Sequence, residues 1–313
     1  MSTTRTMRPR PGRARRRLPL PRLAFIGAAL VALSAMAWAI TRTSADSEPG
    51  PAAVSADPGL SHVHGLGVNP ADGSLFVATH YGTFRIPDDG DAQRVGGSFQ
   101  DTMGFTVAGP DRFLGSGHPD VAGMRAGQPG RLGLIESTDA GETWQDLSLS
   151  GEVDFHGLAF ARDQVFGWDS TSGRFMVSTD RKRWDTRSTL ELYGFAVDPD
   201  EGRRLVAASP WGVRLSSDGG RMWAEPVGPD VVAVSWAADG TLFGIEASGA
   251  VQRSADGGAS WSGSGRLPGQ PQALLAADDA LWAAALGEGE VTGIYHSTDG
   301  GQTWELRYRD GGT

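Results

Sequence analysis

From residue 59 onward, short runs of apolar and β-branched residues alternate with turns rich in glycine, aspartate and proline. Examples of such runs are 62–68, 74–79, 155–160 and 204–208. No part of this region keeps the spacing of an amphipathic helix. Several short strands at regular spacing, separated by turn signals, predict an all-β fold.

One pattern, STDAGETW at 137–144, is repeated along the chain. Near-copies stand at 178–184, 216–223, 254–261 and 297–304, and the tryptophans that end the copies are 40, 39, 38 and 43 residues apart. Self-similarity at this period predicts a propeller or a solenoid. In each copy the Ser and Asp side chains can bond backbone amides, and the Trp can pack between neighbouring units. The copy at 178–184 is degenerate, because basic residues replace its glycine-containing turn.

A second repeat marks the first strand of each unit. Its segments HGLGV, MGFTV, HGLAF, YGFAV, VAVSW and QALLA align at Gly65, Gly104, Gly157, Gly194, Ala233 and Ala273. Each segment is followed by a second and a third strand, and in units two to six by the Asp-containing turn and its Trp. Four strands in each of six units predict a six-bladed β-propeller over 59–313, with seven blades as the weaker alternative. An insertion at 117–130 widens one repeat spacing to 53 residues.

The pattern S-x-D-x-G-x-T-W resembles the Asp-box, or BNR repeat, which sialidases, sortilin-like receptors and photosystem-assembly propellers share. The resemblance covers about residues 60–308 and implies the propeller fold. It implies little about activity, because the same turn occurs in enzymes and in binding proteins. We therefore interpret Asp139, Asp218, Asp256 and Asp299 as turn-forming residues and not as catalysts or metal ligands.

The meander of strands predicts where the histidines lie. If the first strand of each blade starts at one face, here called the top face, the Asp-containing turns lie at the opposite, bottom face. Five of the six histidines then map to the top face of three neighbouring blades. These are His62, His64, His80, His118 and His156. The sixth, His296, maps to the bottom face.

Strand alternation predicts two rings of side chains at the mouth of the central channel. One ring contains His64, Met103, His156, Tyr193, Val232 and Gln272. The ring above it contains His62, Asp101, Asp154, Glu191, Asp230 and Gln270. Together these residues predict a polar site on the top face.

The five top-face histidines are candidate ligands of a transition metal. Imidazole suits zinc, copper, iron or nickel, and the thioether of Met103 or Met124 would favour copper, so copper or zinc is the expected cofactor. Asp101 and Asp154 are expected to bind ligand or to fix the histidine tautomers. The alternative is a water-filled channel lined by hydrogen-bonded polar residues.

Another candidate chemistry is glycoside hydrolysis. The run Phe84–Pro87 is similar to the Phe-Arg-Ile-Pro motif that carries the first of three arginines in sialidases, enzymes that use a Tyr nucleophile with a Glu partner. Tyr193 with Glu191 is the candidate pair here. Arg85 falls on the third strand of unit one and not ahead of the first Asp-box blade, and the two rings contain no further arginine. The register therefore argues against Arg85 as a substrate-binding residue.

The segments HVHGL, ATHYG, GSGHPD and GEVDFHGL are similar to those of exported bacterial Asp-box proteins often catalogued as glycosyl hydrolases or exo-alpha-sialidases. The five top-face histidines match the pattern of that group. This resemblance implies a common function of the top face without identifying it.

The N-terminal region differs from the rest of the chain. Its first 45 residues contain nine arginines and no acidic residue. A basic segment, 1–22, followed by the uncharged apolar segment 23–40 predicts a signal peptide or a membrane-anchor helix, with 41–58 as a flexible linker. The propeller is then exported, either secreted or membrane-anchored on the outer side.

Charge and cysteine content restrict the function classes. Beyond residue 45, 19 basic and 37 acidic residues give a net charge of −18, which argues against a nucleic-acid partner. The absence of cysteine excludes disulfides, thiolate metal sites and cysteine nucleophiles. The sequence thus favours a propeller that binds a metal, small molecule or glycan at its top face. The alternatives are a sialidase-like hydrolase and a platform for an envelope protein partner.

Overall fold

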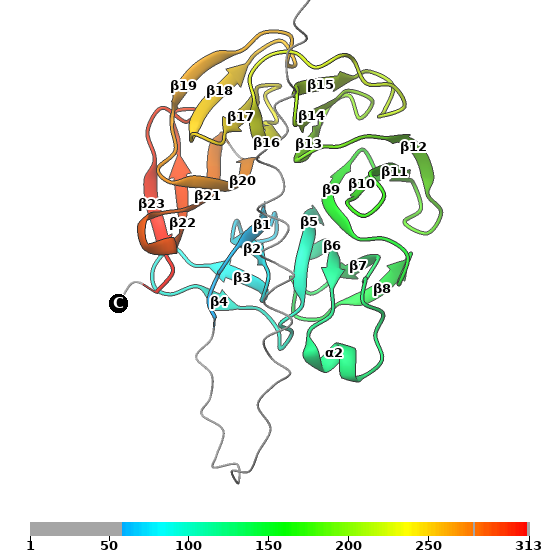
Figure 1. Cartoon of the computed structure of the whole chain (residues 1–313). Helices are drawn as coiled ribbons and strands as arrows, with labels where there is room; N and C mark the ends of the chain where they lie inside the picture. The colour runs from blue at the N-terminus through cyan, green and yellow to red at the C-terminus, as the bar shows by residue number, and fades with distance from the viewer. Residues whose placement is uncertain (1–57, 278, 312–313) are drawn as a thin grey trace, which may run out of the picture. The chain divides into compact units, whose positions relative to one another are not determined.

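The computed structural model describes residues 58–277 and 279–311, which form a ring of six antiparallel sheets (Figure 1). Each sheet uses consecutive strands of the chain, and the first strand of each lies toward the centre. The six-bladed, all-β prediction is confirmed.

The blades follow one another in chain order. Blade one contains β1 (Val63–Val68), β2 (Leu75–Thr79), β3 (Gly82–Ile86) and β4 (Gln93–Arg94). Blade two contains β5 (Asp101–Gly109), β6 (Arg112–His118), β7 (Leu134–Ser137) and β8 (Gln145–Ser148). Blade three contains β9 (Phe155–Ala161), β10 (Gln164–Asp169), β11 (Arg174–Ser178) and β12 (Asp185–Thr189). Blade four contains β13 (Gly194–Val197), β14 (Leu205–Ser209) and β15 (Gly212–Ser216). Blade five contains β16 (Val231–Trp236), β17 (Leu242–Glu246), β18 (Ala250–Ser254) and β19 (Ser262–Arg266). Blade six contains β20 (Gln270–Ala277), β21 (Ala280–Leu286), β22 (Thr292–Ser297) and β23 (Glu305–Arg309).

Blade four differs from the expected four strands. Its sheet has three, and the segment that would form the fourth makes an isolated bridge between Val213 and Val227 and one further backbone hydrogen bond, from Ala224 N to the Leu215 carbonyl. Pro226 and Pro229 flank this bridge, and a proline has no N–H to donate to a neighbouring strand. Local sequence thus limits the pairing at this outer edge.

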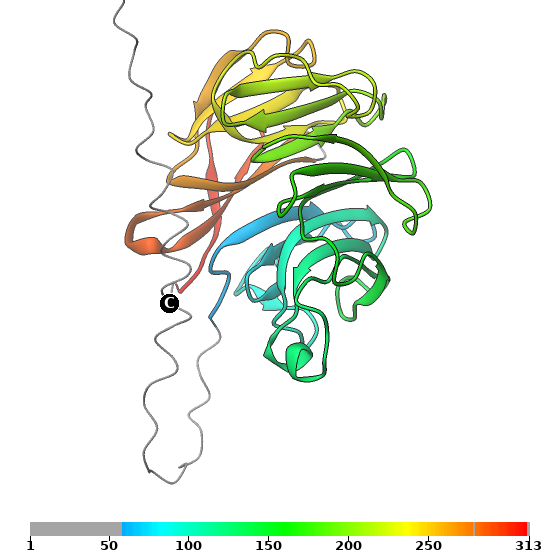
Figure 2. The ribbon, with the colours of Figure 1, turned by 45° about the vertical axis from the view of Figure 1, so that its right-hand side comes forward.

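Two short helical segments interrupt the strands. α2 (Val121–Arg125) lies in the β6–β7 connection, where the insertion at 117–130 was expected, and η2 (Glu288–Glu290) joins β21 to β22. Figure 2 shows α2 standing out from blade two. The apolar segment 23–40 lies outside the described residues, and no helix among those described is long and apolar enough to cross a membrane.

The core lies between neighbouring blades. One cluster joins Leu114 and Leu134 of blade two to Phe155, Val165 and Met176 of blade three, all of them buried. Trp184, which ends the degenerate Asp-box, packs against this cluster. Its ring centroid is 4.9 Å from that of Phe155, and its indole N–H donates to Ser148 Oγ of the preceding blade. The expected packing of these tryptophans between blades is therefore confirmed here.

The Asp-boxes form turns at the bottom face. In the first box, Ser137 Oγ donates to Asp139 Oδ1 at 2.7 Å and accepts from Gly141 N at 2.8 Å. Asp139 also accepts from the backbone and the hydroxyl of Thr143. In the degenerate box, Asp180 still accepts from the amides of Lys182 and Arg183. These carboxylates accept hydrogen bonds within their own turns, as expected for turn-forming residues.

Among the described residues, no strand is exchanged between the first and last blades. Instead, Leu60 N donates to Asp310 Oδ2 at 3.0 Å, and Thr292 Oγ1 donates to the Ser61 carbonyl. At the channel mouth, Val63 N donates to Gln272 Oε1 at 3.2 Å. Side chains of blade six thus hold the start of blade one.

Candidate metal centre

The top-face histidines lie at the ends of strands near the channel. His64 is in β1, His80 follows β2, and Asp101 is the first residue of β5. On the next blade boundary, His118 is the last residue of β6, while Asp154 and His156 flank the start of β9. The meander brings these strand ends to one face because first strands begin there and second strands end there. Four of the five predicted histidines supply atoms to two compact groups.

A bulge marks the channel-facing position of the first strands. In β1 the register shifts between Val63 and Gly65, so His64 is the extra residue. The same shift surrounds Met103, His156, Val232 and Gln272 in four other blades. A bulge bends the strand and changes the direction of the extra side chain. The predicted ring at the channel mouth thus coincides with five bulged positions.

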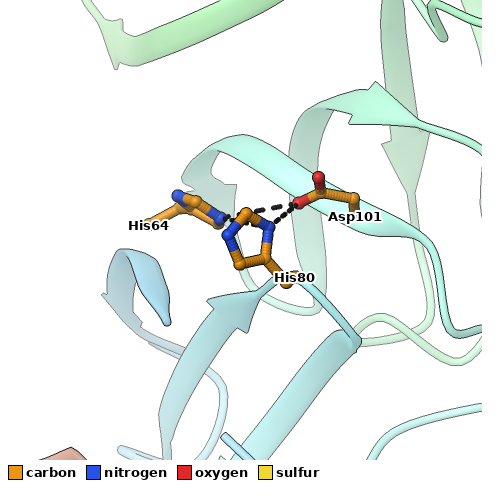
Figure 3. Close-up of side chains that lie close together, drawn as sticks. All are labelled: His64, His80 and Asp101. Atoms are coloured by element: carbon orange, nitrogen blue, oxygen red, sulfur yellow. Dashed lines mark hydrogen bonds and ion pairs between the residues drawn. The ribbon is translucent and has the colours of Figure 1, made fainter. Parts of the chain in front are cut away.

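The first group, called the Asp101 triad, consists of His64, His80 and Asp101. Figure 3 shows the three side chains pointing toward one another. His80 Nδ1 lies 3.2 Å from His64 Nε2 and 3.0 Å from Asp101 Oδ1, and His64 Nε2 lies 3.5 Å from the same oxygen. Asp101 comes from blade two and both histidines from blade one, so the triad bridges a blade boundary.

While Asp101 is ionised, no placement of the ring protons makes all three contacts of this triangle favourable. Each neutral imidazole nitrogen is either a donor or an acceptor, and an ionised carboxylate oxygen only accepts. If both nitrogens donate to Asp101, two N–H groups face each other. If His80 donates to His64, the unprotonated nitrogen of His64 faces the carboxylate of Asp101. A cation between the three atoms would interact favourably with all of them.

The second group, called the Asp154 triad, consists of His118, Asp154 and His156. Asp154 Oδ2 lies 2.9 Å from His156 Nε2 and 3.4 Å from His118 Nε2. The other ring nitrogen of His118, Nδ1, lies 2.7 Å from the Gly130 carbonyl oxygen, which can only accept. Asp154 is from blade three and His118 from blade two, so this triad also bridges two blades.

His62 lies beside the Asp101 triad but supplies no atom to it. Its ring centroid is 4.9 Å from that of His64 and 5.5 Å from that of His80. Its Nδ1 lies 3.1 Å from Gln272 Nε2, while Gln272 Oε1 accepts from Val63 N. Because the amide nitrogen of Gln272 can only donate, Nδ1 of His62 is an acceptor. His62 therefore packs against the triad from the side of blade six.

Burial lowers the pKa values of two of these histidines, whereas a neighbouring carboxylate raises the pKa of a third. Burial, with His64 and His80 nearby, lowers the pKa of His62 to about 4, and burial also lowers that of His64. The hydrogen bond to Asp154 raises the pKa of His118 to about 9. Burial opposes ionisation of Asp101, but hydrogen bonds from His64 and His80 outweigh it and lower the carboxyl pKa to about 2. The two triads also interact, since His156 contributes to lowering the pKa of His64.

The channel below the triads contains a cavity of about 340 Å³. His64, His156, Tyr193 and Gln272 line its polar end. Apolar side chains line the rest, including Leu158, Phe195, Val234 and Leu274. A cavity of this size is at the small end of the range for small-molecule sites. Both triads contribute a histidine to it, so they share one entrance.

The other candidate residues lie apart from the triads. Tyr193 is at the cavity rim with 58 % of its surface exposed, and no hydrogen bond joins it to Glu191 among the described residues. Arg85 donates to Ser74 Oγ at 2.9 Å and to Asp72 at 3.1 Å, at the β1–β2 turn on the bottom face. Arg85 is thus at the opposite end of its blade from the histidines, as the register indicated.

Two methionines and the sixth histidine complete the set. Met103 is half-buried at the bulge of β5, one blade from His64, and Met124 is exposed on α2. His296 stacks on Trp282 in blade six, with ring centroids 4.2 Å apart, close to the last Asp-box at the bottom face. Of these three, only Met103 belongs to the predicted ring at the channel mouth, two residues from Asp101.

The repeat also matches a family model. Residues 295–306 match the model described as BNR/Asp-box repeat. That match lies in blade six, whose box has the same Ser–Asp and Ser–Gly hydrogen bonds as the first. The chain thus carries Asp-box turns on a six-bladed β-propeller. No curated protein sequence matches this chain.

Solved structures with a similar fold confirm the architecture of this Asp-box propeller. An ancestral GH74 enzyme superposes with a TM-score of 0.52 at 14 % identity, over 81 % of this chain and 38 % of that enzyme's chain. A chain of a nidogen/laminin complex superposes with a TM-score of 0.58 at 11 % identity, over 74 % of this chain and 92 % of its own. At such identities the similarity concerns the fold alone.

Sequence reasoning grouped the five histidines into one cluster, with the two aspartates expected to bind ligand or to fix the histidine tautomers. The structure instead pairs each aspartate with its own two histidines at separate blade boundaries. The Gly130 carbonyl was also missed. Its only sequence signal is the insertion, whose ends meet where Leu132 N donates to the Gly117 carbonyl at 2.8 Å.

Proposed function

We propose that this propeller binds a divalent transition-metal ion, zinc or copper, through the Asp101 triad on its top face. The observation that carries the proposal is the triangle formed by His64 Nε2, His80 Nδ1 and Asp101 Oδ1. With Asp101 ionised, one side of that triangle remains unfavourable under every arrangement of the ring protons, whereas a cation is compatible with all three sides. Imidazole and carboxylate are ligands that both metals accept.

The dimensions of the triad support the same proposal. Ligands about 2.0–2.1 Å from a tetrahedral zinc ion lie roughly 3.3 Å from one another. The three sides of the triangle are 3.2, 3.0 and 3.5 Å. An ion held this way keeps a coordination position open toward the channel, where water or a small ligand could bind. Met103 would favour copper over zinc if its sulfur completes the site.

We place this activity outside the cytoplasm. The support is the basic segment 1–22 and the apolar segment 23–40, which together have the composition of an export signal or anchor. Fusion of residues 1–58 to a reporter that folds only after export tests this. Export is expected to require 23–40, and activity of the reporter on the cytoplasmic side would contradict the proposal.

The metal proposal is tested by metal analysis of the full-length protein after exposure to Zn²⁺ or Cu²⁺ and removal of free ion. His80→Ala removes one of the three ligands and is expected to abolish metal binding at the triad. Because the His80 side chain is 38 % exposed, the fold is expected to persist in this variant. His64→Ala is a second test of the same site. His296→Ala, on the opposite face, is the matched control and is expected to retain all bound metal. Unchanged metal content in both His64→Ala and His80→Ala would contradict the proposal.

A second candidate function, an envelope interaction platform, is supported by exposed apolar side chains. Several occupy top-face loops and the insertion, each at least 42 % exposed. They are Tyr81, Phe99, Val121, Met124, Tyr193 and Trp211. Exposed apolar groups gathered on one face are typical of interaction surfaces. Crosslinking of the double variant Tyr193→Ala/Trp211→Ala in the producing cell tests this, with Met222→Ala at the bottom-face Asp-box as control. Equal capture of partner by both variants would contradict it.

The glycosidase alternative has weaker support. Tyr193 lines the cavity, but Arg85 is engaged by Ser74 and Asp72 on the bottom face. Turnover of a fluorogenic sialoside by the full-length protein, abolished in Tyr193→Phe and in Glu191→Gln, would favour it. We expect no such turnover.

A further inference from the structure

We infer that the Asp154 triad binds a second divalent transition-metal ion, so that the full-length protein holds two ions at the mouth of its channel. This inference deepens the proposed function and rests on it, because both triads use imidazole and carboxylate ligands. Its evidence comes from a different blade boundary and from contacts that the Asp101 triad does not have.

The first contact fixes the tautomer of His118. The Gly130 carbonyl oxygen only accepts, so the nitrogen 2.7 Å from it, Nδ1, carries a proton. Nε2 of His118 lies 3.4 Å from Asp154 Oδ2 and donates to it while the ring is an imidazolium. Loss of that one proton gives a neutral ring whose Nδ1 keeps its proton and whose Nε2 offers a lone pair to a metal ion. A metal-ligating histidine commonly has this arrangement, with its other N–H donated to a backbone carbonyl.

The second observation concerns the carboxylate of Asp154. Its side chain is only 5 % exposed, and its Oδ2 lies near both histidines of the triad. The other oxygen, Oδ1, is buried and accepts no hydrogen bond within the described part of the chain. A buried acceptor without a partner is costly, and a cation beside the carboxylate would compensate for it. Asp154 therefore has both the position and an unused acceptor for an ion.

The third observation is that the two sites share the channel mouth. His64 of the first triad and His156 of the second line the same cavity. Two cations held beside one cavity repel each other. The second equivalent is therefore expected to bind more weakly than the first.

Zinc titration of the full-length, chelator-treated protein tests this inference, with bound metal counted per chain. Wild type is expected to bind two ions in two resolvable steps. His118→Ala, at a side chain that is 42 % exposed, is expected to lose one ion and keep the other. His80→Ala is expected to lose the ion of the Asp101 triad, and the double variant His80→Ala/His118→Ala is expected to lose both ions. His156→Ala is a second variant for the Asp154 triad, and His296→Ala is the control. Near-ultraviolet circular dichroism establishes that each variant is folded.

The outcomes separate the two proposals. One ion in wild type that His80→Ala abolishes and His118→Ala leaves unchanged would overturn the second site and preserve the first. One ion abolished by either variant would mean a single shared site, which also overturns the inference. Binding that is unaffected by His80→Ala but lost in His118→Ala would overturn the proposed function at the Asp101 triad.

Discussion

At the scale of single residues, two histidines of the same face are held in opposite protonation states. Burial, with His64 and His80 nearby, lowers the pKa of His62 to about 4, so its imidazole is neutral at pH 7. The bond to Asp154 raises the pKa of His118 to about 9, so in the metal-free protein this ring is an imidazolium at pH 7. Burial beside two other histidines decides the state of His62, and contact with a carboxylate decides that of His118.

Long-range ¹H–¹⁵N NMR of the metal-free protein tests this assignment. At pH 7 we expect His62 with a single protonated ring nitrogen and His118 with both nitrogens protonated. Asp154→Asn is expected to lower the pKa of His118 toward its ordinary value, because it removes the charge that stabilises the imidazolium. An unchanged His118 titration in that variant would contradict the assignment.

The sequence predicted which residues line the mouth, but not how they pair. His64 and His156 were recognisable because each is the first residue of a copy of the first-strand repeat, which is a local signal. The meeting of Asp101 with His80 depends on how closely two blades approach, and that distance is set by packing far from either residue in the sequence. The same limit applies to His118 and the Gly130 carbonyl, which meet through the fold of the insertion.

At the scale of strands, glycine at the first-strand repeat allows close approach of neighbouring blades. A Cβ at Gly104 would lie 2.4 Å from the Phe155 carbonyl oxygen, whereas a Cβ at the equivalent Gly194 has no atom within 4 Å. Gly104→Ala is expected to lower the free energy of unfolding by about 1–3 kcal/mol, because the backbone of β9 must move. Gly194→Ala is the matched control, with a change expected within about 0.5 kcal/mol. Equal effects in urea unfolding would contradict this packing.

The Asp-box turns are expected to weaken in acid. Bonds from the hydroxyl and amide of Thr303 and from Ser297 lower the pKa of Asp299 to about 2. A carboxylate whose folded pKa is lowered stabilises the fold fully above its ordinary pKa, and this stabilisation is lost as pH falls through the folded value. The stability difference between wild type and Asp299→Asn should therefore shrink between about pH 4 and pH 2. Urea unfolding followed by tryptophan fluorescence measures it, and a constant difference would contradict the assigned role.

At the scale of the whole molecule, the ring depends on contacts between its first and last blades. Asp310 Oδ2 accepts from the amide of Leu60, a residue that is fully buried. Asp310→Ala leaves that amide without its acceptor and is expected to lower the free energy of unfolding by roughly 1–3 kcal/mol. Asp89→Ala, at an exposed residue of the β3–β4 turn in blade one, is the control and is expected to be neutral. Equal stability of both variants would contradict closure through Asp310.

The number of blades was predictable because the first-strand repeat occurs six times, and five of the six repeats also contain an Asp-box turn and its tryptophan. The local sequence also contained a signal for the missing fourth strand of blade four, namely Pro226 and Pro229, but the number of repeats alone did not show it. The site was only partly predictable. The fold places both triads across blade boundaries, and sequence repeats describe single blades and not the contacts between them.

The central claim is that the Asp101 triad is a metal site, and anomalous diffraction from a crystal soaked with zinc or copper tests it most directly. We expect an anomalous peak at the metal's absorption edge within coordinating distance of His64 Nε2, His80 Nδ1 and Asp101 Oδ1. The absence of a peak there, in a crystal whose soaked metal is visible at any other site, would contradict the claim.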